Sequence, residues 1–174
     1  MKHFVYNNAG PTEEEYEIIY DISFGLNTVL EFGPGSSTWA FIEANVKEII
    51  SYEFDKRWLE ETKTRFNGLV DIRYFDHTRF PLTVDDDIEN RKFDLILVDS
   101  PIGLHGKKTP RFEGYENCSR WNTLEWASRH TDHILLHDSH REGEQESIRR
   151  LIETDKFDLT TYNTEKGIAE LKRK

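Results

Sequence analysis

The sequence predicts a single α/β domain over residues 1–174, with a helical region at 1–26 and a mostly parallel seven-stranded sheet covered by helices on both faces. Short apolar runs alternate with segments of helical periodicity, a pattern typical of βαβ units. The run at 93–99 is apolar through its centre, as expected of a strand buried on both faces. A Gly33-Pro34-Gly35 turn joins an expected strand to an expected helix, where doubly wound sheets bind ligands.

The amino-acid composition excludes several classes of protein and site. The chain has 33 acidic and 23 basic residues, a net charge of −10, which disfavours nonspecific nucleic-acid binding. Its 4 Trp, 7 Tyr and 11 Phe supply enough large apolar side chains for a core. No apolar run approaches the roughly 20 residues of a membrane helix, so no membrane partner is expected. A single cysteine, Cys118, excludes an intramolecular disulfide and a cysteine-built zinc site, and we expect a cytoplasmic protein.

The first helix is expected over 11–24, because Thr12 and Glu15 have the spacing of a capping box and apolar residues then recur at helical intervals. A strand at 28–32 follows and ends at the glycine turn. The serines after that turn are candidate caps for a helix over 36–45.

A second unit consists of a strand at 48–53, a helix over 56–66 capped by Asp55, and a strand at 70–75. Loops are expected at 81–91 and 101–114, on either side of the strand at 93–99. A loop as long as the second is usually functional or disordered.

The last third of the chain begins with a helix over 117–129 and a strand at 133–137. Ser139 and Glu142 have capping-box spacing for a helix over 142–154. The remaining strands, expected to pair as an antiparallel hairpin, cover 157–162 and 167–171.

The glycine turn is the first candidate site. Glycines at 33 and 35 let the backbone approach a ligand closely, although a plain tight turn has the same appearance. Glu53 ends the next strand, where an acidic side chain can hold ribose hydroxyls. A nicotinamide-binding loop would have glycine where this chain has Thr38, and Pro34 also departs from that loop. These residues favour S-adenosylmethionine over a nicotinamide cofactor.

This pattern resembles the class I S-adenosylmethionine-dependent methyltransferases, which have a Rossmann-like fold. The resemblance implies that Glu31 lies near the amino-acid part of the cofactor, Glu53 at the ribose and Asp76 at the adenine amine. The other side chains and glycines that it assigns to the cofactor are Gly33, Gly35, Ser36, Ser37, Phe54 and Asp99. For Asp76, an ordinary turn residue is an equal alternative.

Three further blocks resemble the glucuronoxylan O-methyltransferase family. They are the segments at 52–58, at 99–103 with Arg111 downstream, and at 137–144. The resemblance implies O-methyl transfer to a sugar or to a uronate-containing saccharide. Arg111 and Arg141 are then candidates for binding an acidic acceptor, because arginine pairs well with carboxylates.

Methyl transfer to a hydroxyl needs a group that takes the hydroxyl proton. Asp99, His137, Asp138 and His140 are candidates, because they follow strands whose carboxyl ends meet at one edge of the sheet. Helix capping by Asp138 and a structural, buried His137 are the alternatives.

Asp99 and Asp138 could instead hold a divalent cation such as magnesium, whose preferred ligands are oxygen atoms. That arrangement resembles the metal-dependent, catechol-type O-methyltransferases. A cofactor-binding protein without catalytic activity is a third interpretation, and the acids at these two strand ends argue against it.

Overall fold

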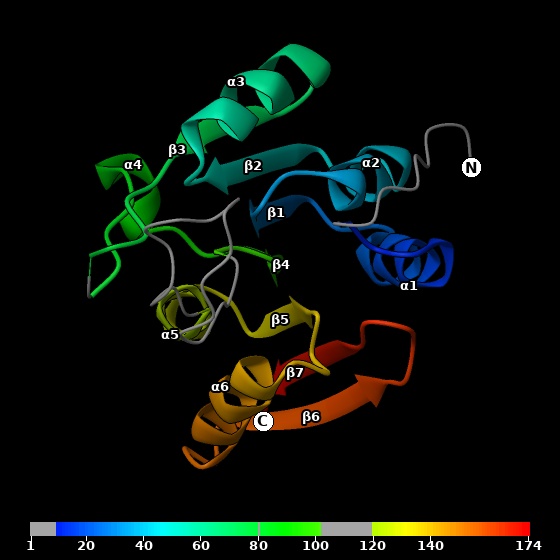
Figure 1. Ribbon diagram of the computed structural model, residues 1–174, viewed down its shortest axis with the longest axis vertical. Helices are drawn as coiled ribbons and strands as arrows, with labels where there is room; N and C mark the ends of the chain where they lie inside the picture. Colours follow the sequence, from blue (N-terminus) through cyan, green and yellow to red (C-terminus); the bar gives the residue numbers. More distant parts are fainter. Residues whose placement is uncertain (1–9, 80, 102–119) are drawn as a thin grey trace.

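The protein is built on one seven-stranded sheet (Figure 1), as expected. A computed structural model describes residues 10–79, 81–101 and 120–174. The strands are β1 Thr28–Phe32, β2 Glu48–Glu53, β3 Asp71–Tyr74, β4 Leu95–Val98, β5 His133–His137, β6 Phe157–Tyr162 and β7 Ile168–Arg173. Their order is β3-β2-β1-β4-β5-β7-β6, and only β7 runs antiparallel to its neighbours, β5 and β6.

Helices cover both faces of this sheet. They are α1 Glu13–Ser23, α2 Ser36–Glu43, α3 Lys56–Arg65, α4 Asp86–Glu89, α5 Trp121–His130 and α6 Glu142–Ile152. Figure 1 shows α1 and α2 on one side of the sheet and α4, α5 and α6 on the other. Strand β4 supplies both cores, since Leu95 and Leu97 pack toward α1 and α2 while Ile96 and Val98 pack toward α5 and α6. The short helix α4 lies in a segment expected to be a loop.

Two of the expected helix caps are present. Thr12 Oγ1 accepts a hydrogen bond from Glu15 N at 3.3 Å, and Glu15 Oε2 accepts one from Thr12 N at 2.8 Å, which completes the capping box of α1. Asp55 caps α3 by accepting hydrogen bonds from Arg57 N and Trp58 N.

The capping box expected at Ser139 and Glu142 is wrong. Helix α6 begins at Glu142 with Arg141 at the N-cap position, and no side chain caps it. The chain turns at Asp138, which has a φ of 58°, and Ser139 N then donates to Gly167 O at 3.0 Å. Ser139 is therefore held against the C-terminal hairpin.

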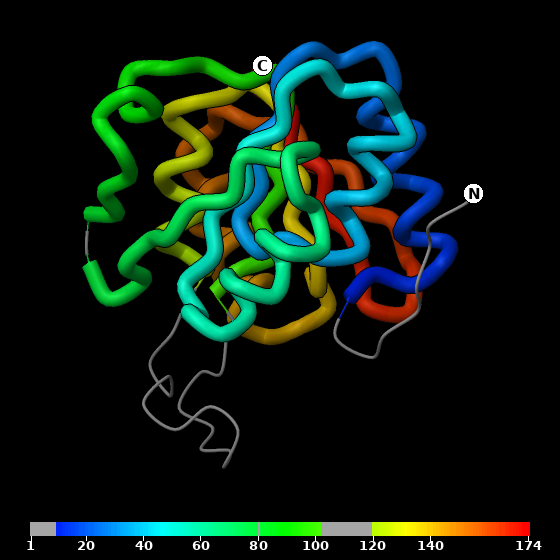
Figure 2. Tube along the Cα trace, turned by 90° about the horizontal axis from the view of Figure 1, so that it is seen from above, coloured from blue at the N-terminus to red at the C-terminus, as the bar shows by residue number. Residues whose placement is uncertain are grey.

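The N-terminal helix and the C-terminal hairpin lie side by side, as both Figure 1 and Figure 2 show. Glu15 of α1 accepts hydrogen bonds from Thr164 Oγ1 at 2.6 Å and from Lys166 N at 2.8 Å, both in the turn between β6 and β7. Lys166 Nζ donates in return to Gly10 O. Among the described residues, every helix is too short or too polar to cross a lipid bilayer.

Candidate active site

Four parallel strands bring most of the predicted site residues to one edge of the sheet. Phe32 of β1 pairs with Tyr52 of β2 and Val98 of β4, and Val98 in turn pairs with Leu136 of β5. The next residues along these strands are Gly33, Glu53, Asp99 and His137. This register is the reason why side chains from distant parts of the sequence share one site.

The glycine turn packs directly against the end of β4. Gly33 has a φ of 98°, and a Cβ atom there would lie 2.9 Å from Ser100 Cβ and 3.2 Å from the carbonyl carbon of Asp99. A larger residue at position 33 would therefore push the two strand ends apart. Gly35 differs, because a Cβ atom there would meet no atom of residues 10–79, 81–101 or 120–174 within 4 Å. The turn thus leaves open space beside Gly35.

Glu31 is fully buried and binds the first turn of α2. Thr38 Oγ1 donates to Glu31 Oε2 at 2.7 Å, Ser51 Oγ donates to the same oxygen at 2.9 Å, and Ser37 donates to Oε1. Burial raises the pKa of Glu31 to about 7 despite these hydrogen bonds. All of these partners belong to the protein, and Ser36 is also buried. Contact of Glu31, Ser36 or Ser37 with a cofactor stays a prediction.

Glu53 is buried at the end of β2, with one carboxylate oxygen engaged. Its Oε1 accepts hydrogen bonds from Phe54 N and Asp55 N, both at 2.8 Å, and no side chain or amide in the described ranges donates to Oε2. Burial raises the pKa of Glu53 to about 8, against the effect of the two amides. Phe54 is 6% exposed and packs on the rings of Phe75 and His77.

Asp76 has the contacts of a turn residue. Its carboxylate accepts hydrogen bonds from Thr78 N at 3.0 Å, Thr78 Oγ1 at 2.6 Å and Arg79 Nε at 3.2 Å. These bonds match the alternative given for Asp76 from the sequence, and its contact with an adenine amine stays a prediction.

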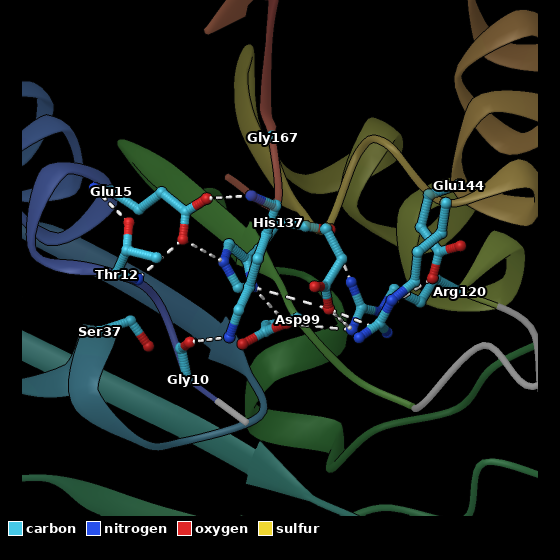
Figure 3. Close-up of polar contacts among 12 residues, drawn as sticks. Gly10, Thr12, Glu15, Ser37, Asp99, Arg120, His137, Glu144 and Gly167 are labelled. Carbon is cyan, nitrogen blue, oxygen red and sulfur yellow. Dashed lines mark hydrogen bonds and ion pairs between the residues drawn. The ribbon is translucent and has the colours of Figure 1, made fainter. Parts of the chain in front are cut away.

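A chain of carboxylates and one imidazole crosses the ends of β4 and β5 (Figure 3). His137 is 1% exposed, and its Nδ1 lies 2.9 Å from Asp99 Oδ1 while its Nε2 lies 3.1 Å from Glu15 Oε2. Burial opposes a charged imidazole, but Asp99 and Glu15 outweigh it and raise the pKa of His137 to about 9. Hydrogen bonds from His137 and Thr164 lower the pKa of Glu15, although burial acts in the opposite direction. His137 therefore carries both ring protons at neutral pH.

Arg120 completes this chain on the other side of Asp99 (Figure 3). One of its terminal nitrogens lies 3.0 Å from Asp99 Oδ1 and 2.8 Å from Asp138 Oδ2, and its Nε lies 3.4 Å from Glu144 Oε1. It also donates to the backbone oxygens of Pro101 and His137. Burial would raise the pKa of Asp99, but the charges of His137 and Arg120 hold it below its usual range.

Glu15, Arg120 and Glu144 are the members of this cluster whose roles the sequence did not reveal. Glu15 was expected only to cap a helix, and its partner His137 lies 122 residues away. Arg120 was expected inside a helix, and Glu144 was noted only as part of a block. The one available signal was Glu144, since a buried acid in an amphipathic helix needs a partner.

Of the other predicted site residues, Asp138 belongs to this cluster, Arg141 borders it and His140 lies apart from it. Asp138 is buried and pairs with Arg120 and with Arg141 Nη1 at 2.9 Å. Arg141 stays partly accessible, with 44% of its side chain exposed. His140 is exposed and lines an open groove between α6 and β6, to which neither Asp99 nor His137 contributes. Arg111, proposed to bind an acidic acceptor, lies outside the described residues.

The two acids that the sequence offered as alternative metal ligands, Asp99 and Asp138, do come together, with His137 beside them. Asp99, Asp138 and His137 each offer one ligand atom, and these atoms lie within 4.8 Å of one another. Arg120 shares the same two carboxylates, and a guanidinium is always charged. The cluster thus already holds one strong cation.

No protein-family model matches the sequence, and no curated protein is significantly similar to it. Solved structures do match the fold. A methyltransferase from Podospora anserina, PaMTH1 with SAH bound, is 13% identical with a TM-score of 0.69 over 96% of this chain and 81% of its own. An O-methyltransferase from Bacillus cereus in complex with SAH is 16% identical with a TM-score of 0.69 over 97% of this chain and 84% of its own.

A third match is the N-terminal domain of EvdMO1 in the presence of SAH and D-fucose. It is 15% identical with a TM-score of 0.60 over 92% of this chain and 81% of its own. The chain has the Rossmann-like methyltransferase fold. At these levels of identity the likeness concerns the fold alone.

The charge of His137 gives a pH-dependent stability. Because its folded pKa of about 9 lies above the ordinary 6.5, its contribution is complete below pH 6.5 and is lost as the pH rises through 9. This shift corresponds to as much as about 3 kcal/mol, at 1.36 kcal/mol per pKa unit. We expect the unfolding free energy of the wild type to fall more steeply between pH 6.5 and 9 than that of His137→Gln.

Denaturant titrations of both proteins across this pH range measure the difference. Glu31 and Glu53 also weaken the fold as they ionise, but they are present in both proteins, so the difference isolates His137. Parallel curves would show that folding does not raise the pKa of His137.

Proposed function

We propose that this protein is an S-adenosylmethionine-dependent O-methyltransferase. One observation carries the proposal. Within the described residues, open space beside Gly35 lies at the same sheet edge as two carboxyl groups, each with one oxygen held by hydrogen bonds and the other without a donor. These carboxylates are Glu53 and Asp99. The bound SAH named for solved structures of the same fold supports this assignment.

The cofactor site fits the residues present. Glu53 Oε1 is held by two backbone amides, so Oε2 is oriented and can meet ribose hydroxyls. A carboxyl group with a pKa near 8 is mostly protonated at neutral pH, so it can accept one hydrogen bond and donate another. Glu31 supports the site indirectly, because it fixes the first turn of α2 beside Gly35.

When bound, S-adenosylmethionine supplies an electrophilic methyl group on a sulfonium. Methyl transfer would form a bond between the acceptor oxygen and the methyl carbon and break the bond between that carbon and sulfur, so a residue of this chain would have to take the hydroxyl proton. Asp99 is the acid of the cluster best placed to take this proton. Its side chain is 13% exposed, its Oδ1 is held by His137 and Arg120, and no donor in the described structure is bonded to Oδ2.

The other candidate bases are less suited. His137 lies between two carboxylates and carries both ring protons, so it orients Asp99 instead of accepting a proton. Asp138 is 4% exposed and neutralised by two arginines. His140 lines a separate groove. In this proposal Asp99 is the catalytic residue, and His137 is a positioning residue.

We propose a sugar or uronate-containing saccharide as the acceptor. Arg141 is an accessible cation beside the cluster, with 44% of its side chain exposed, and arginine binds carboxylates with two parallel hydrogen bonds. The structure of EvdMO1 in the presence of D-fucose supports a sugar-binding cleft on this fold. Arg111 is proposed to contribute from the following loop.

Calorimetric titration with S-adenosylhomocysteine tests the cofactor assignment. We expect a micromolar dissociation constant, about −8 kcal/mol, and no comparable binding of NAD. Glu53→Ala should weaken binding roughly tenfold, since two hydrogen bonds worth about 0.5–1.5 kcal/mol each are lost. Glu48→Ala is the matched control, because Glu48 begins the same strand and pairs with Arg91 on the surface. Absence of binding by the wild type would refute the proposed function.

The acceptor assignment is tested by initial rates with methyl glucuronide and methyl glucoside. We expect the acid to be methylated faster, because Arg141 pairs with its carboxylate. Arg141→Ala should raise the Michaelis constant for the glucuronide several-fold and leave that for the glucoside unchanged. Arg149→Ala, an exposed arginine of α6, serves as the control. Equal rates for the two sugars with the wild type would contradict the assignment.

A further inference from the structure

Arg120 is a buried charge placed where four elements meet. It precedes α5, and only 2% of its side chain is exposed. Its partners are Asp99 after β4, Asp138 after β5 and Glu144 in α6, together with two backbone carbonyls. A buried guanidinium is tolerated only where its charge and its N–H groups are matched in this way. The surrounding acids are therefore arranged around the guanidinium group of Arg120.

The arginine uses the same oxygen atoms that a metal would need. Asp99 Oδ1 and Asp138 Oδ2 both lie within 3.0 Å of one nitrogen of Arg120. A divalent cation binds such oxygens at about 2.0–2.6 Å, and it would have to share them with this positive nitrogen. The three groups that could surround a metal are Asp99, His137 and Asp138. His137 directs its Nδ1–H at Asp99 Oδ1, so this nitrogen has no lone pair free to bind a metal. The described residues thus do not fit a divalent cation.

We propose that the Arg120 guanidinium takes the place of a divalent cation between Asp99 and Asp138, and that the protein works without a metal. Resting on the function proposed above, this makes Arg120 a positioning residue, which keeps Asp99 Oδ1 fixed so that Oδ2 faces the acceptor. The arrangement also ties the position of Asp99 to α5 and α6, because the same guanidinium pairs with Glu144.

The balance of acidic and basic side chains around Arg120 supports a protein side chain as the cation at this position. Without Arg120, the carboxylates of Asp99, Asp138 and Glu144 would share the buried end of the sheet, and the cations that the described residues pair with them would be His137 and the half-exposed Arg141. Like charges at such distances repel strongly in a low dielectric. Removing Arg120 should therefore create a site that attracts a divalent cation.

Titration with Mn²⁺, followed by electron paramagnetic resonance of the free ion, tests this inference. We expect the wild type to show no Mn²⁺ binding beyond that of Asp99→Asn. Arg120→Ala should gain one Mn²⁺ site, with an affinity for Mn²⁺ at least tenfold higher than that of the wild type. The double variant Arg120→Ala/Asp138→Asn should lose this site again. Arg120→Lys, which keeps the positive charge, should behave as the wild type.

Stoichiometric Mn²⁺ binding by the wild type that Asp99→Asn abolishes would overturn the proposal. A folded Arg120→Ala protein that gains no site would overturn it as well. If Arg120→Ala does not fold, the comparison of the wild type, Asp99→Asn and Arg120→Lys decides between the two outcomes.

Titration of the same samples with S-adenosylhomocysteine separates this inference from the proposed function. A wild type that binds neither Mn²⁺ nor S-adenosylhomocysteine would refute the function alone. A wild type that binds both, with Mn²⁺ held by Asp99, would refute the inference alone.

Discussion

Burial of the Arg120 guanidinium beside the ends of β4 and β5 is the constraint on which the site depends. A charge with 2% of its side chain exposed requires acids within ion-pairing distance, and the fold supplies Asp99 after β4, Asp138 after β5 and Glu144 in α6. Because these acids are held by the arginine, their positions are set before any ligand arrives. Preorganised charge of this kind loses little energy to rearrangement during a reaction.

A second interaction extends this constraint to both ends of the domain. Glu15 of α1 binds His137 from one side and the turn between β6 and β7 from the other. The N-terminal helix, the fifth strand and the C-terminal hairpin are thus joined at one carboxylate. Since His137 also holds Asp99, movement of α1 or of the hairpin would shift the carboxylate of Asp99, whose Oδ2 is the proposed proton acceptor.

The architecture could be predicted well because its signals are local. Strands such as β1 and β5 follow directly from short apolar runs, and caps such as Thr12 and Asp55 act on residues two or three positions away. The cap predicted at Ser139 failed for a nonlocal reason, since the backbone there is held by the hairpin. The pairing of Glu15 with His137 could not be read from spacing, because the fold alone brings them together.

In the candidate site, too, the residues with local sequence signals were predicted, and the contacts made by the fold were not. Glu53 and Asp99 were identified because strand ends are recognisable in sequence, and both lie at the predicted edge. A divalent metal between Asp99 and Asp138 was an alternative that the sequence left open. The sequence reveals two acids at neighbouring strand ends but not which side chain from elsewhere lies between them, and in the structure that side chain is Arg120. Arg120 belongs to a segment whose periodicity predicts only a helix.

Methyl transfer by Asp99→Asn tests the proposed catalytic role of Asp99. We expect the turnover number with methyl glucuronide to fall at least roughly 100-fold, the scale of a lost proton acceptor. Affinity for S-adenosylhomocysteine should stay within a few-fold of the wild type, because Glu53 and the glycine turn are unchanged. A variant that binds S-adenosylhomocysteine normally and turns over at the wild-type rate would contradict this account.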